Sequence, residues 1–249
     1  MMRPNFRYDS LGVTHEGKVR VYNEDALLLR PEIGLWMVAD GMGGHARGRW
    51  ASATIISEAD AVQLTDGFGP SLECVAEALR AANRTIHAAA EAAGEPMGST
   101  VVALLIRDER FAGLWTGDSR LYRLRRGALA RLTHDHSLVQ DLVDREKLSP
   151  QEAQHHPMSH ILSHAVGTES TLRLDLVVGE LEDGDVFLLC SDGLTDVVDE
   201  AEISAHLSEP DQVSRRLLDL ALRRGAPDNV TVVSIACQAI TTPPRPGDA

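Results

Sequence analysis

Cysteine is scarce in this sequence, with three among 249 residues. Cys74, Cys190 and Cys237 are widely spaced and no Cys-x-x-Cys pair occurs, which argues against a disulfide framework and against a structural zinc site. Long apolar runs are also lacking, because no segment approaches the length of a membrane span and the N-terminal residues lead into no apolar signal core. We therefore expect a cytoplasmic protein in a reducing compartment, with no membrane partner.

Basic and aromatic residues are few as well. The 24 bases stand against 37 acids, and the resulting formal charge of -13 argues against binding to nucleic acid or to an anionic membrane. Aromatic residues make up 4% and hydrophobic residues 43%, so leucine, valine, isoleucine and alanine must fill a core that is still ample for a globular protein. Part of the acidic excess could serve as metal ligands.

Apolar, strand-like runs alternate with helical segments along the chain. No linker divides it, so we expect one domain over residues 1–240, with a helical flap at about residues 139–160 and a disordered, proline-rich tail at 241–249. The flap contains Ser149-Pro150-Gln151-Glu152, which has the N-cap residue, the first-turn proline and the acid of a capping box. Helices are predicted at residues 51–62, 72–93, 137–154 in two pieces, 199–207 and 210–224. Strands are predicted at residues 35–39, 100–106, 111–116, 121–124, 128–132, 172–178, 186–189 and 230–235.

Acidic residues recur at the ends of these strands. An Asp-Gly pair by itself often makes only a turn, and we interpret Asp183-Gly184 in that way. Five groups with the same placement predict more than turns. They are Asp40 after residues 35–39, Asp118 after 111–116, Asp192 after 186–190, Asp228 just before 230–235, and Glu24-Asp25 just before 26–29.

Neighbouring strands can bring such ends to one edge of a sheet, where converging carboxylates are costly unless cations neutralise them. Carboxylates, backbone carbonyls and water are hard oxygen ligands that suit Mg²⁺ or Mn²⁺. Arg20 lies four residues before Glu24, and its guanidinium group suits bidentate binding of a phosphate, although a lone arginine can equally be a surface ion-pair partner. Together these residues predict a metal-dependent phosphatase.

Seven short motifs occur in order from near the N-terminus to residue 235. They are Gly17-x-x-Arg20-x-x-Asn23-Glu24-Asp25, Val38-Ala39-Asp40-Gly41-Met42-Gly43-Gly44-His45, Gly98-Ser99-Thr100, Thr116-Gly117-Asp118-Ser119-Arg120, Leu132-Thr133-x-Asp135-His136-Ser137, Cys190-Ser191-Asp192-Gly193-Leu194 and Asp228-Asn229-Val230-Thr231. In this combination the chain resembles the PPM (type 2C) family of metal-dependent protein serine/threonine phosphatases, in its bacterial branch. The resemblance covers nearly the whole chain.

The resemblance implies an α+β fold, a four-layer α-β-β-α sandwich in which helices flank two antiparallel sheets and the metals lie in a cleft at one end. It implies two Mn²⁺ or Mg²⁺ ions, with a third in bacterial members. On the family pattern Asp40 bridges two ions, Asp192 and Asp228 complete the shell of one, and the Gly41 carbonyl serves the other.

The remaining matches extend this implied site. Asp118, together with Asp192, matches the third metal site of bacterial members. Glu24 and Asp25 would act directly on the metals or through metal-bound water. Arg20 matches the phosphate-binding arginine, and Asn229 would hold the geometry around the ligands.

The implied mechanism needs no phosphoenzyme, because two close cations lower the pKa of a bridging water and the resulting hydroxide attacks phosphorus in line. The proton donor for the leaving oxygen is open. Met42 stands where animal relatives place a histidine, and His45 or metal-bound water are the alternatives. Two further departures, Gly48-Arg49 and His164, bear on substrate preference or local packing, whereas His136 and His164 are interpreted as structural.

The resemblance also implies what the protein acts on: phosphoserine or phosphothreonine proteins, including a cognate bacterial serine/threonine kinase or its targets, with the chain acting as a free-standing monomer. Two rivals are a catalytically silent member that serves as a binding module and a two-metal phosphodiesterase. Retention of Asp40, Asp118, Asp192 and Asp228 favours an active enzyme over the silent member.

Three other sequence patterns give only weak indications of alternative functions. Gly12-x-x-x-x-Gly17-Lys18 falls short of a phosphate-binding loop because Val19 replaces the required hydroxyl residue. The Cys74 to Arg80 spacing of thiol phosphatases falls in a helix-forming segment, and the scattered histidines are better interpreted as surface residues than as a zinc site.

Overall fold

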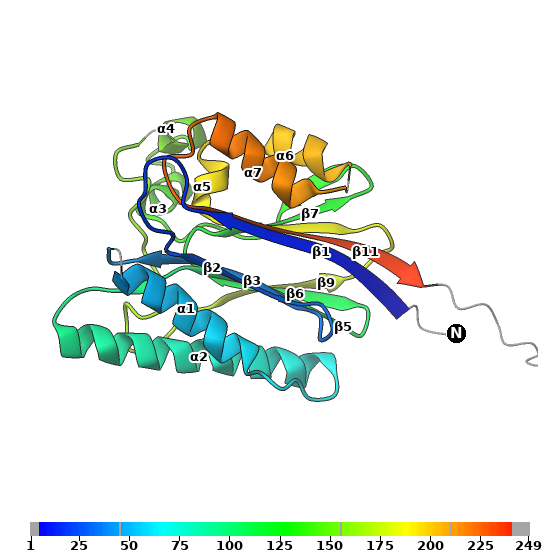
Figure 1. Ribbon diagram of the computed structural model, residues 1–249, viewed down its shortest axis with the longest axis horizontal. Helices are drawn as coiled ribbons and strands as arrows, with labels where there is room; N and C mark the ends of the chain where they lie inside the picture. The colour runs from blue at the N-terminus through cyan, green and yellow to red at the C-terminus, as the bar shows by residue number, and fades with distance from the viewer. Residues whose placement is uncertain (1–4, 45, 155, 210, 241–249) are drawn as a thin grey trace, which may run out of the picture.

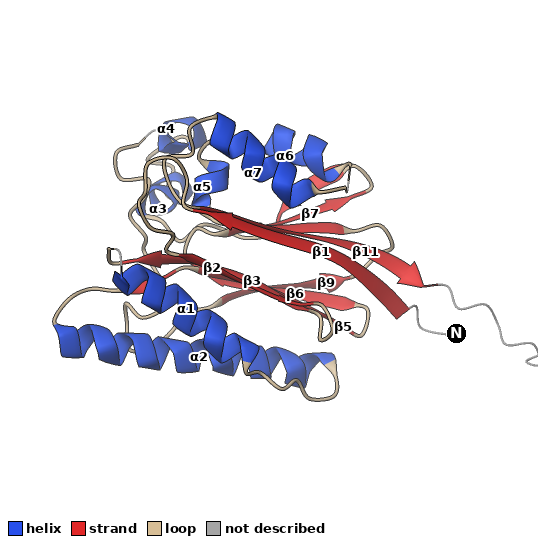
Figure 2. Cartoon of the chain, viewed as in Figure 1, coloured by secondary structure: helices blue, strands red, loops and turns tan. Residues whose placement is uncertain are grey.

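Two antiparallel β-sheets lie face to face, and helices cover the outer face of each (Figure 1). The computed structural model describes residues 5–44, 46–154, 156–209 and 211–240. Figure 2 shows the order of the layers, helices, sheet, sheet and helices. The predicted α-β-β-α sandwich is therefore the observed architecture.

The first sheet has the strand order β1-β11-β10-β7-β8 and lies beneath α5, α6 and α7. Its edge strand β1 pairs antiparallel with the neighbouring β11 along the full length of both strands, from Asn5 opposite Ile240 to His15 opposite Val230. The elements are β1 (Asn5–His15), β7 (Arg120–Arg125), β8 (Ala128–Arg131), β10 (Val186–Cys190), β11 (Val230–Ile240), α5 (Asp192–Thr195), α6 (Glu200–Leu207) and α7 (Val213–Arg223).

The second sheet has the order β2-β3-β5-β6-β9, with the short β4 paired to β3. The long helices α1 and α2 cover its outer face (Figure 1). The elements are β2 (Asp25–Arg30), β3 (Leu35–Met42), β4 (Gly98–Ser99), β5 (Val101–Arg107), β6 (Arg110–Thr116), β9 (Asp175–Glu180), α1 (Ala46–Asp60) and α2 (Phe68–Ala93).

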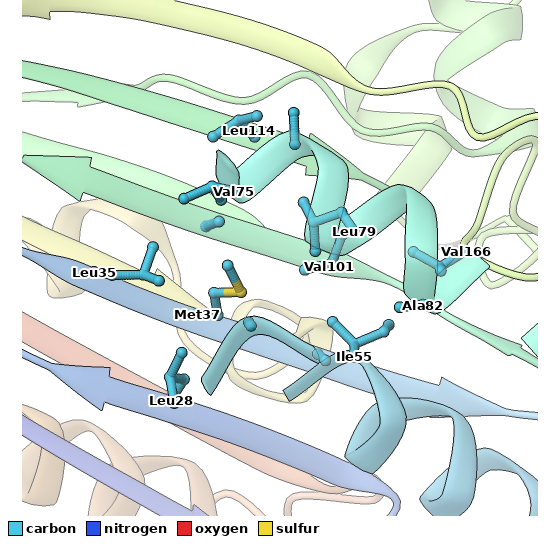
Figure 3. Close-up of a cluster of buried hydrophobic side chains, with 14 of the residues drawn as sticks. Leu28, Leu35, Met37, Ile55, Val75, Leu79, Ala82, Val101, Leu114 and Val166 are labelled. Atoms are coloured by element: carbon cyan, nitrogen blue, oxygen red, sulfur yellow. The ribbon is translucent and has the colours of Figure 1, made fainter. Parts of the chain in front are cut away.

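Strand β3 shows why a continuous apolar run is needed at the centre of this sandwich. Side chains alternate between the two faces of a strand, so a strand covered on both faces must be apolar at every position. Trp36 and Val38 point into the core between the sheets, whereas Leu35 and Met37 belong to the core beneath the helices. Figure 3 shows that second core, where Met37 lies among side chains of α1 and α2 such as Ile55.

The predicted strands and helices are present, with shifted ends. Helix α1 begins at Ala46 and α2 at Phe68, so both start earlier than the sequence predicted, and β9 is displaced toward residue 180. Strand β1 was not predicted, because its polar residues at 7, 9 and 10 interrupt the apolar pattern. Residues 16–24, between β1 and β2, contain a turn and a bend and no strand.

The predicted flap holds two short helices, α3 (Leu138–Asp144) and α4 (Pro150–Gln154). The capping box is formed, because the Glu152 N–H donates to Ser149 Oγ at 3.2 Å and the Ser149 N–H donates to Glu152 Oε2 at 2.9 Å. The predicted tail at 241–249 lies outside the described residues. No helix in the described ranges is both long enough and apolar enough to cross a membrane.

The pairing of the strands brings the predicted acids to one end of the sandwich. Asp25 lies directly opposite Asp40 in the antiparallel pair of β2 and β3. In the other sheet, the end of β10 lies beside the start of β11, where the Ser191 N–H donates to the Thr231 carbonyl at 3.1 Å. Asp192 and Asp228 therefore emerge at neighbouring positions.

Candidate metal centre

A cleft of about 580 Å³ opens at this end of the two sheets. Both sheets contribute to it, as do the loop before β2, the glycine loop after β3 and the flap. Its lining includes eight of the nine predicted site residues, Asp25 being the one that lies beneath it. The lining residues are Val19, Arg20, Glu24, Asp40, Gly41, Met42, Gly43, Gly44, Thr100, Asp118, His160, Leu162, Asp192, Asp196, Pro227, Asp228 and Asn229.

Asp25 is buried at the floor of the cleft and links the two sheets. Its Oδ2 accepts hydrogen bonds from Ser191 Oγ at 2.8 Å and from Thr231 Oγ1 at 2.7 Å. Its Oδ1 is buried without a hydrogen-bond partner among the residues that the structure describes. One oxygen of this carboxylate is thus fixed by the second sheet, while the other remains available beside Asp40.

A hydroxyl network holds Asp40 and Asp118 in place. The Asp40 N–H donates to Thr100 Oγ1 at 3.1 Å, and the Thr100 N–H donates to the Asp40 carbonyl at 2.8 Å. Thr100 Oγ1 also shares a 2.7 Å hydrogen bond with Ser119 Oγ, next to Asp118. Gly117 adopts φ +101°, and a Cβ there would lie 2.6 Å from the Thr100 Cβ, so the turn before Asp118 requires glycine.

Asp192 and Asp228 come from the first sheet. Asp192 is the first residue of α5, directly after its N-cap Ser191. Its Oδ1 is buried and has no hydrogen-bond partner within the described ranges. Asp228 precedes β11 and accepts from the Asn229 N–H at 2.8 Å. Its two oxygens also accept from Arg20, Oδ1 from Nε at 2.9 Å and Oδ2 from Nη2 at 2.7 Å.

Crowding of carboxylates changes their acid–base behaviour. Burial raises the pKa of Asp25 to about 6, and burial together with Asp135 raises the pKa of Asp118 to about 7. Burial and the neighbouring carboxylates hold the pKa of Asp40 and of Asp192 well above the ordinary range. The described side chains around these four acids do not compensate their charge near neutral pH.

Divalent cations fit this arrangement. Asp25 Oδ1 and Asp192 Oδ1 are buried polar atoms with no partner in the described part of the chain, and an orphaned buried carboxylate oxygen is costly. The donor set consists of hard oxygen atoms from carboxylates and from the Gly41 backbone at the cleft wall, which is the set that Mg²⁺ and Mn²⁺ prefer. The site therefore has the chemistry of a magnesium or manganese centre.

Asn229 ties the loop before β2 to the start of β11. Its Oδ1 accepts from the Glu24 N–H at 2.8 Å, and its Nδ2 donates to the carbonyls of Glu16 and Tyr22 at 3.0 Å and 2.9 Å. Both N–H donors and one acceptor lone pair of this amide therefore bind backbone groups. The side chain holds the segment that presents Arg20 to the cleft.

Glu24 packs against the first turn of α1. Its backbone carbonyl accepts from Ser52 Oγ at 2.6 Å, and a Cβ on Gly48 would lie 2.0 Å from Glu24 Oε2. Glycine at position 48 is therefore required for the Glu24 carboxylate to lie where it does. The neighbouring Arg49 is exposed, so its departure from the family pattern changes the surface beside the cleft.

Comparison with known proteins identifies the family. The family model described as Protein phosphatase 2C matches residues 12–219. The chain belongs to the protein phosphatase 2C family. Serine/threonine protein phosphatase PstP of Mycobacterium tuberculosis is 40% identical over 221 residues, and this chain covers 42% of its length while 87% of this chain is matched. Serine/threonine phosphatase stp of Listeria innocua is 32% identical over 234 residues, with 89% of this chain and 93% of that protein covered.

Solved protein phosphatase 2C structures share the fold. PppA, a regulatory component of the type VI secretion system in Pseudomonas aeruginosa, superposes with a TM-score of 0.87 at 40% identity, over 95% of this chain and all of that one. The catalytic domain of PstP in complex with two manganese ions gives a TM-score of 0.86 at 36% identity, over 94% of this chain and all of that one. The fold of this phosphatase domain is therefore established.

Two cleft residues of this protein phosphatase 2C domain were not singled out as site residues from the sequence. His160, at the end of the flap, and Asp196 approach Asp192, and one ligand atom from each lies within 4.8 Å of the other two. Asp196 follows Asp192 by four residues at the end of α5, a spacing that places both on one face of a helical turn and could have been found in the sequence. His160 gave no such signal, because its position depends on how the flap folds back.

Several other sequence interpretations can now be placed. Met42 lines the cleft, whereas His45 lies outside the described residues. His136 accepts from the Gly117 N–H at 3.2 Å and contacts Asp175 at 3.2 Å, and its ring stacks on Trp115, in keeping with a structural histidine. His164 packs edge-on against that ring.

Proposed function

We propose that this chain is a metal-dependent protein serine/threonine phosphatase that hydrolyses phosphoserine and phosphothreonine. The observation that carries this proposal is that aspartates from both sheets line one cleft together with an arginine. These residues are Asp40, Asp118, Asp192, Asp228 and Arg20. Membership of the protein phosphatase 2C family supports the same reaction, and the manganese-bound PstP structure supports Mn²⁺ or Mg²⁺ as the cofactor.

In this proposal Asp40 would hold both ions, Asp192 and Asp228 would help to hold one of them, and the Gly41 carbonyl would help to hold the other. Two hydroxyl groups orient Asp25, so it directs one free oxygen toward the same space. When bound, the cations offset the charge of the phosphate and lower the pKa of water to near neutrality.

Asp118 and Asp192 would form a third, more exposed ion site on the flap side of the cleft. His160 and Asp196 extend that side, and their approach to Asp192 supports it. Glu24, on the opposite side, would contact an ion directly or through water.

Arg20 is the proposed phosphate-binding residue. The guanidinium group has five N–H donors, of which Nε and one on Nη2 are occupied by Asp228. The remaining donors, those on Nη1 and the second on Nη2, are able to hold phosphate oxygens, and Asp228 fixes the plane of the group. The ion pair therefore orients Arg20, and the hydrogen bond and charge of Asp228 raise its pKa.

The proposed substrates are phosphorylated proteins, including a cognate serine/threonine kinase or its targets, acted on in the cytoplasm by a monomer as part of a signalling pathway. The net charge of -13 supports protein rather than nucleic-acid substrates. A decisive assay measures phosphate release from a phosphothreonine peptide with Mn²⁺ and with EDTA.

We expect turnover with Mn²⁺, and EDTA should abolish it. A phosphodiester substrate in the same buffer tests the phosphodiesterase alternative and should be cleaved far more slowly than the phosphomonoester. Absence of any hydrolysis while calorimetry shows Mn²⁺ binding would refute the enzyme and favour a catalytically silent binding module.

A further inference from the structure

The loop that carries Arg20 is covered with exposed apolar side chains. Among the described residues eight large hydrophobic side chains are exposed, and three of them, Val19, Val21 and Tyr22, lie within one stretch of four residues. Val19 is 69% and Val21 78% exposed. Single exposed apolar side chains are ordinary, but a cluster beside a cleft marks an interaction site.

The backbone of this loop is fixed at both ends. The Lys18 N–H donates to the Ala226 carbonyl at 2.9 Å, and Asn229 binds the carbonyls of Glu16 and Tyr22. Gly17 has φ +79°, and a Cβ there would lie 2.1 Å from the Asp228 carbonyl oxygen, so this turn packs closely on the segment that bears Asp228, just before β11. The apolar side chains are thus held out to solvent by an anchored backbone.

The position of the cluster indicates its occupant. Val19 and Arg20 both line the cleft that holds the aspartates, and the exposed Val21 follows Arg20 directly in the sequence. Consecutive Cα atoms of a polypeptide are about 3.8 Å apart, so the residues next to a phosphorylated residue bound at Arg20 would lie over its immediate neighbours in the loop. No separate partner is needed to explain the cluster, because the substrate chain must cross this rim.

We propose that Val19, Val21 and Tyr22 form a substrate ledge that binds an apolar side chain directly flanking the phosphorylated residue. This rests on the proposed phosphatase function and specifies its substrates as phosphopeptides with an apolar residue at an adjacent position. Apolar contact at a rim selects among peptides without taking part in the chemistry, and a difference of one well-packed apolar group changes kcat/KM by about tenfold.

The test compares two phosphothreonine peptides that differ only in whether leucine or serine stands on each side of the phosphothreonine. With the unmodified protein we expect kcat/KM to favour the leucine peptide by about tenfold. Val21→Ser should reduce that preference to about twofold, and Val21→Leu should keep it. Val178→Ser is the matched control, because Val178 is 40% exposed on β9, an edge strand of the other sheet, and should leave the preference unchanged.

Turnover of p-nitrophenyl phosphate, which has no flanking residues, separates this inference from the proposed function. It should be the same in all four proteins. Fluorescence anisotropy with labelled peptides carrying a non-hydrolysable phosphonate measures the same preference as binding, so an inactive protein would refute the phosphatase and still test the ledge. Equal affinity and equal kcat/KM for both peptides, or a preference that survives Val21→Ser, would overturn the ledge.

Discussion

Strand β10 has a recessed aspartate at each end, and the two differ in how their charge is balanced. Asp185 precedes the strand and its side chain is completely buried, yet both oxygens are satisfied. Arg125 donates to Oδ1 and Oδ2 at 2.6 Å each, and the Glu182 N–H donates to Oδ2 at 3.0 Å. Asp192 follows the strand, and its Oδ1 is buried with no partner among the described residues.

The difference separates an acid that serves the fold from an acid that serves a ligand. Burying a carboxylate is costly, and a bidentate arginine offsets that cost for Asp185 within the chain itself. At the other end burial and the neighbouring carboxylates hold the pKa of Asp192 well above the ordinary range. In the ionised state an added cation balances that end, so the same residue type at two ends of one strand has two physical roles.

The largest effect is expected from Asp192→Asn. Loss of one ligand charge from the proposed centre should lower kcat by roughly 10³-fold in the presence of Mn²⁺, about 4 kcal/mol of barrier. Without metal the variant should be at least as stable as the unmodified protein, because one unbalanced charge has been removed. Phosphopeptide turnover and thermal unfolding in EDTA measure the two effects, and a variant that retains activity would contradict the assignment of this residue.

Asp185→Asn is the opposite experiment on the same strand. The amide cannot balance Arg125, so we expect the free energy of unfolding to fall by about 3 kcal/mol, near the lower limit for breaking a buried ion pair, since Arg125 keeps Glu182 as a partner. The kcat of the folded enzyme should not change. Urea unfolding followed by tryptophan fluorescence, paired with kinetics at low temperature, measures both. If Asp185→Asn lowered kcat and left the free energy of unfolding unchanged, the distinction between the two ends of β10 would be wrong.

Removal of metal should make stability depend on pH. Asp25 and Asp118 have pKa values of about 6 and about 7 in the folded, metal-free protein, above their ordinary range near 4, so between these limits the folded chain binds more protons than the unfolded chain. The free energy of unfolding therefore falls as pH rises from about 4 to about 7 in EDTA. Each kcal/mol corresponds to about 3 °C in Tm for a chain of this size, so a decrease of several degrees is expected.

Mn²⁺ should reverse this trend, because the ion binds the deprotonated carboxylates and its stabilisation grows with pH. Differential scanning fluorimetry with EDTA and with Mn²⁺ gives both curves. Asp185→Asn serves as the control, since its curves should be displaced downward with the same pH dependence. Parallel curves with and without metal in the unmodified protein would mean that these acids do not hold the ion.

The contrast also explains what the sequence could and could not predict. Strands covered on both faces, such as residues 35–39, were predictable because they must be continuously apolar, and Asp192 was found because it follows such a run. The α-β-β-α sandwich itself was implied by the resemblance to the PPM family and not by these patterns. The role of Asp185 was not predicted, because it looks like one more turn acid and its partner Arg125 is 60 residues away in sequence. The approach of His160 to the cleft likewise depends on how the flap folds, which local patterns do not determine.

Asn229→Asp gives the smallest expected effect. Asn229 lies in the cleft with Asp192, but its side-chain amide is paired with backbone groups. The substitution keeps the shape of the side chain and the acceptor for the Glu24 N–H, but replaces the donor to the Glu16 and Tyr22 carbonyls with an oxygen that repels them. The loop that presents Arg20 should loosen, raising KM about fivefold for phosphopeptides with a smaller change in kcat, which corresponds to about 1 kcal/mol. Ser52→Ala, which removes a hydrogen bond to the Glu24 carbonyl on the far side of the same segment, is the control and should affect KM less. If Asn229→Asp instead lowered kcat as strongly as Asp192→Asn at unchanged KM, Asn229 would have to be assigned to the metal ligands rather than to the support of the loop.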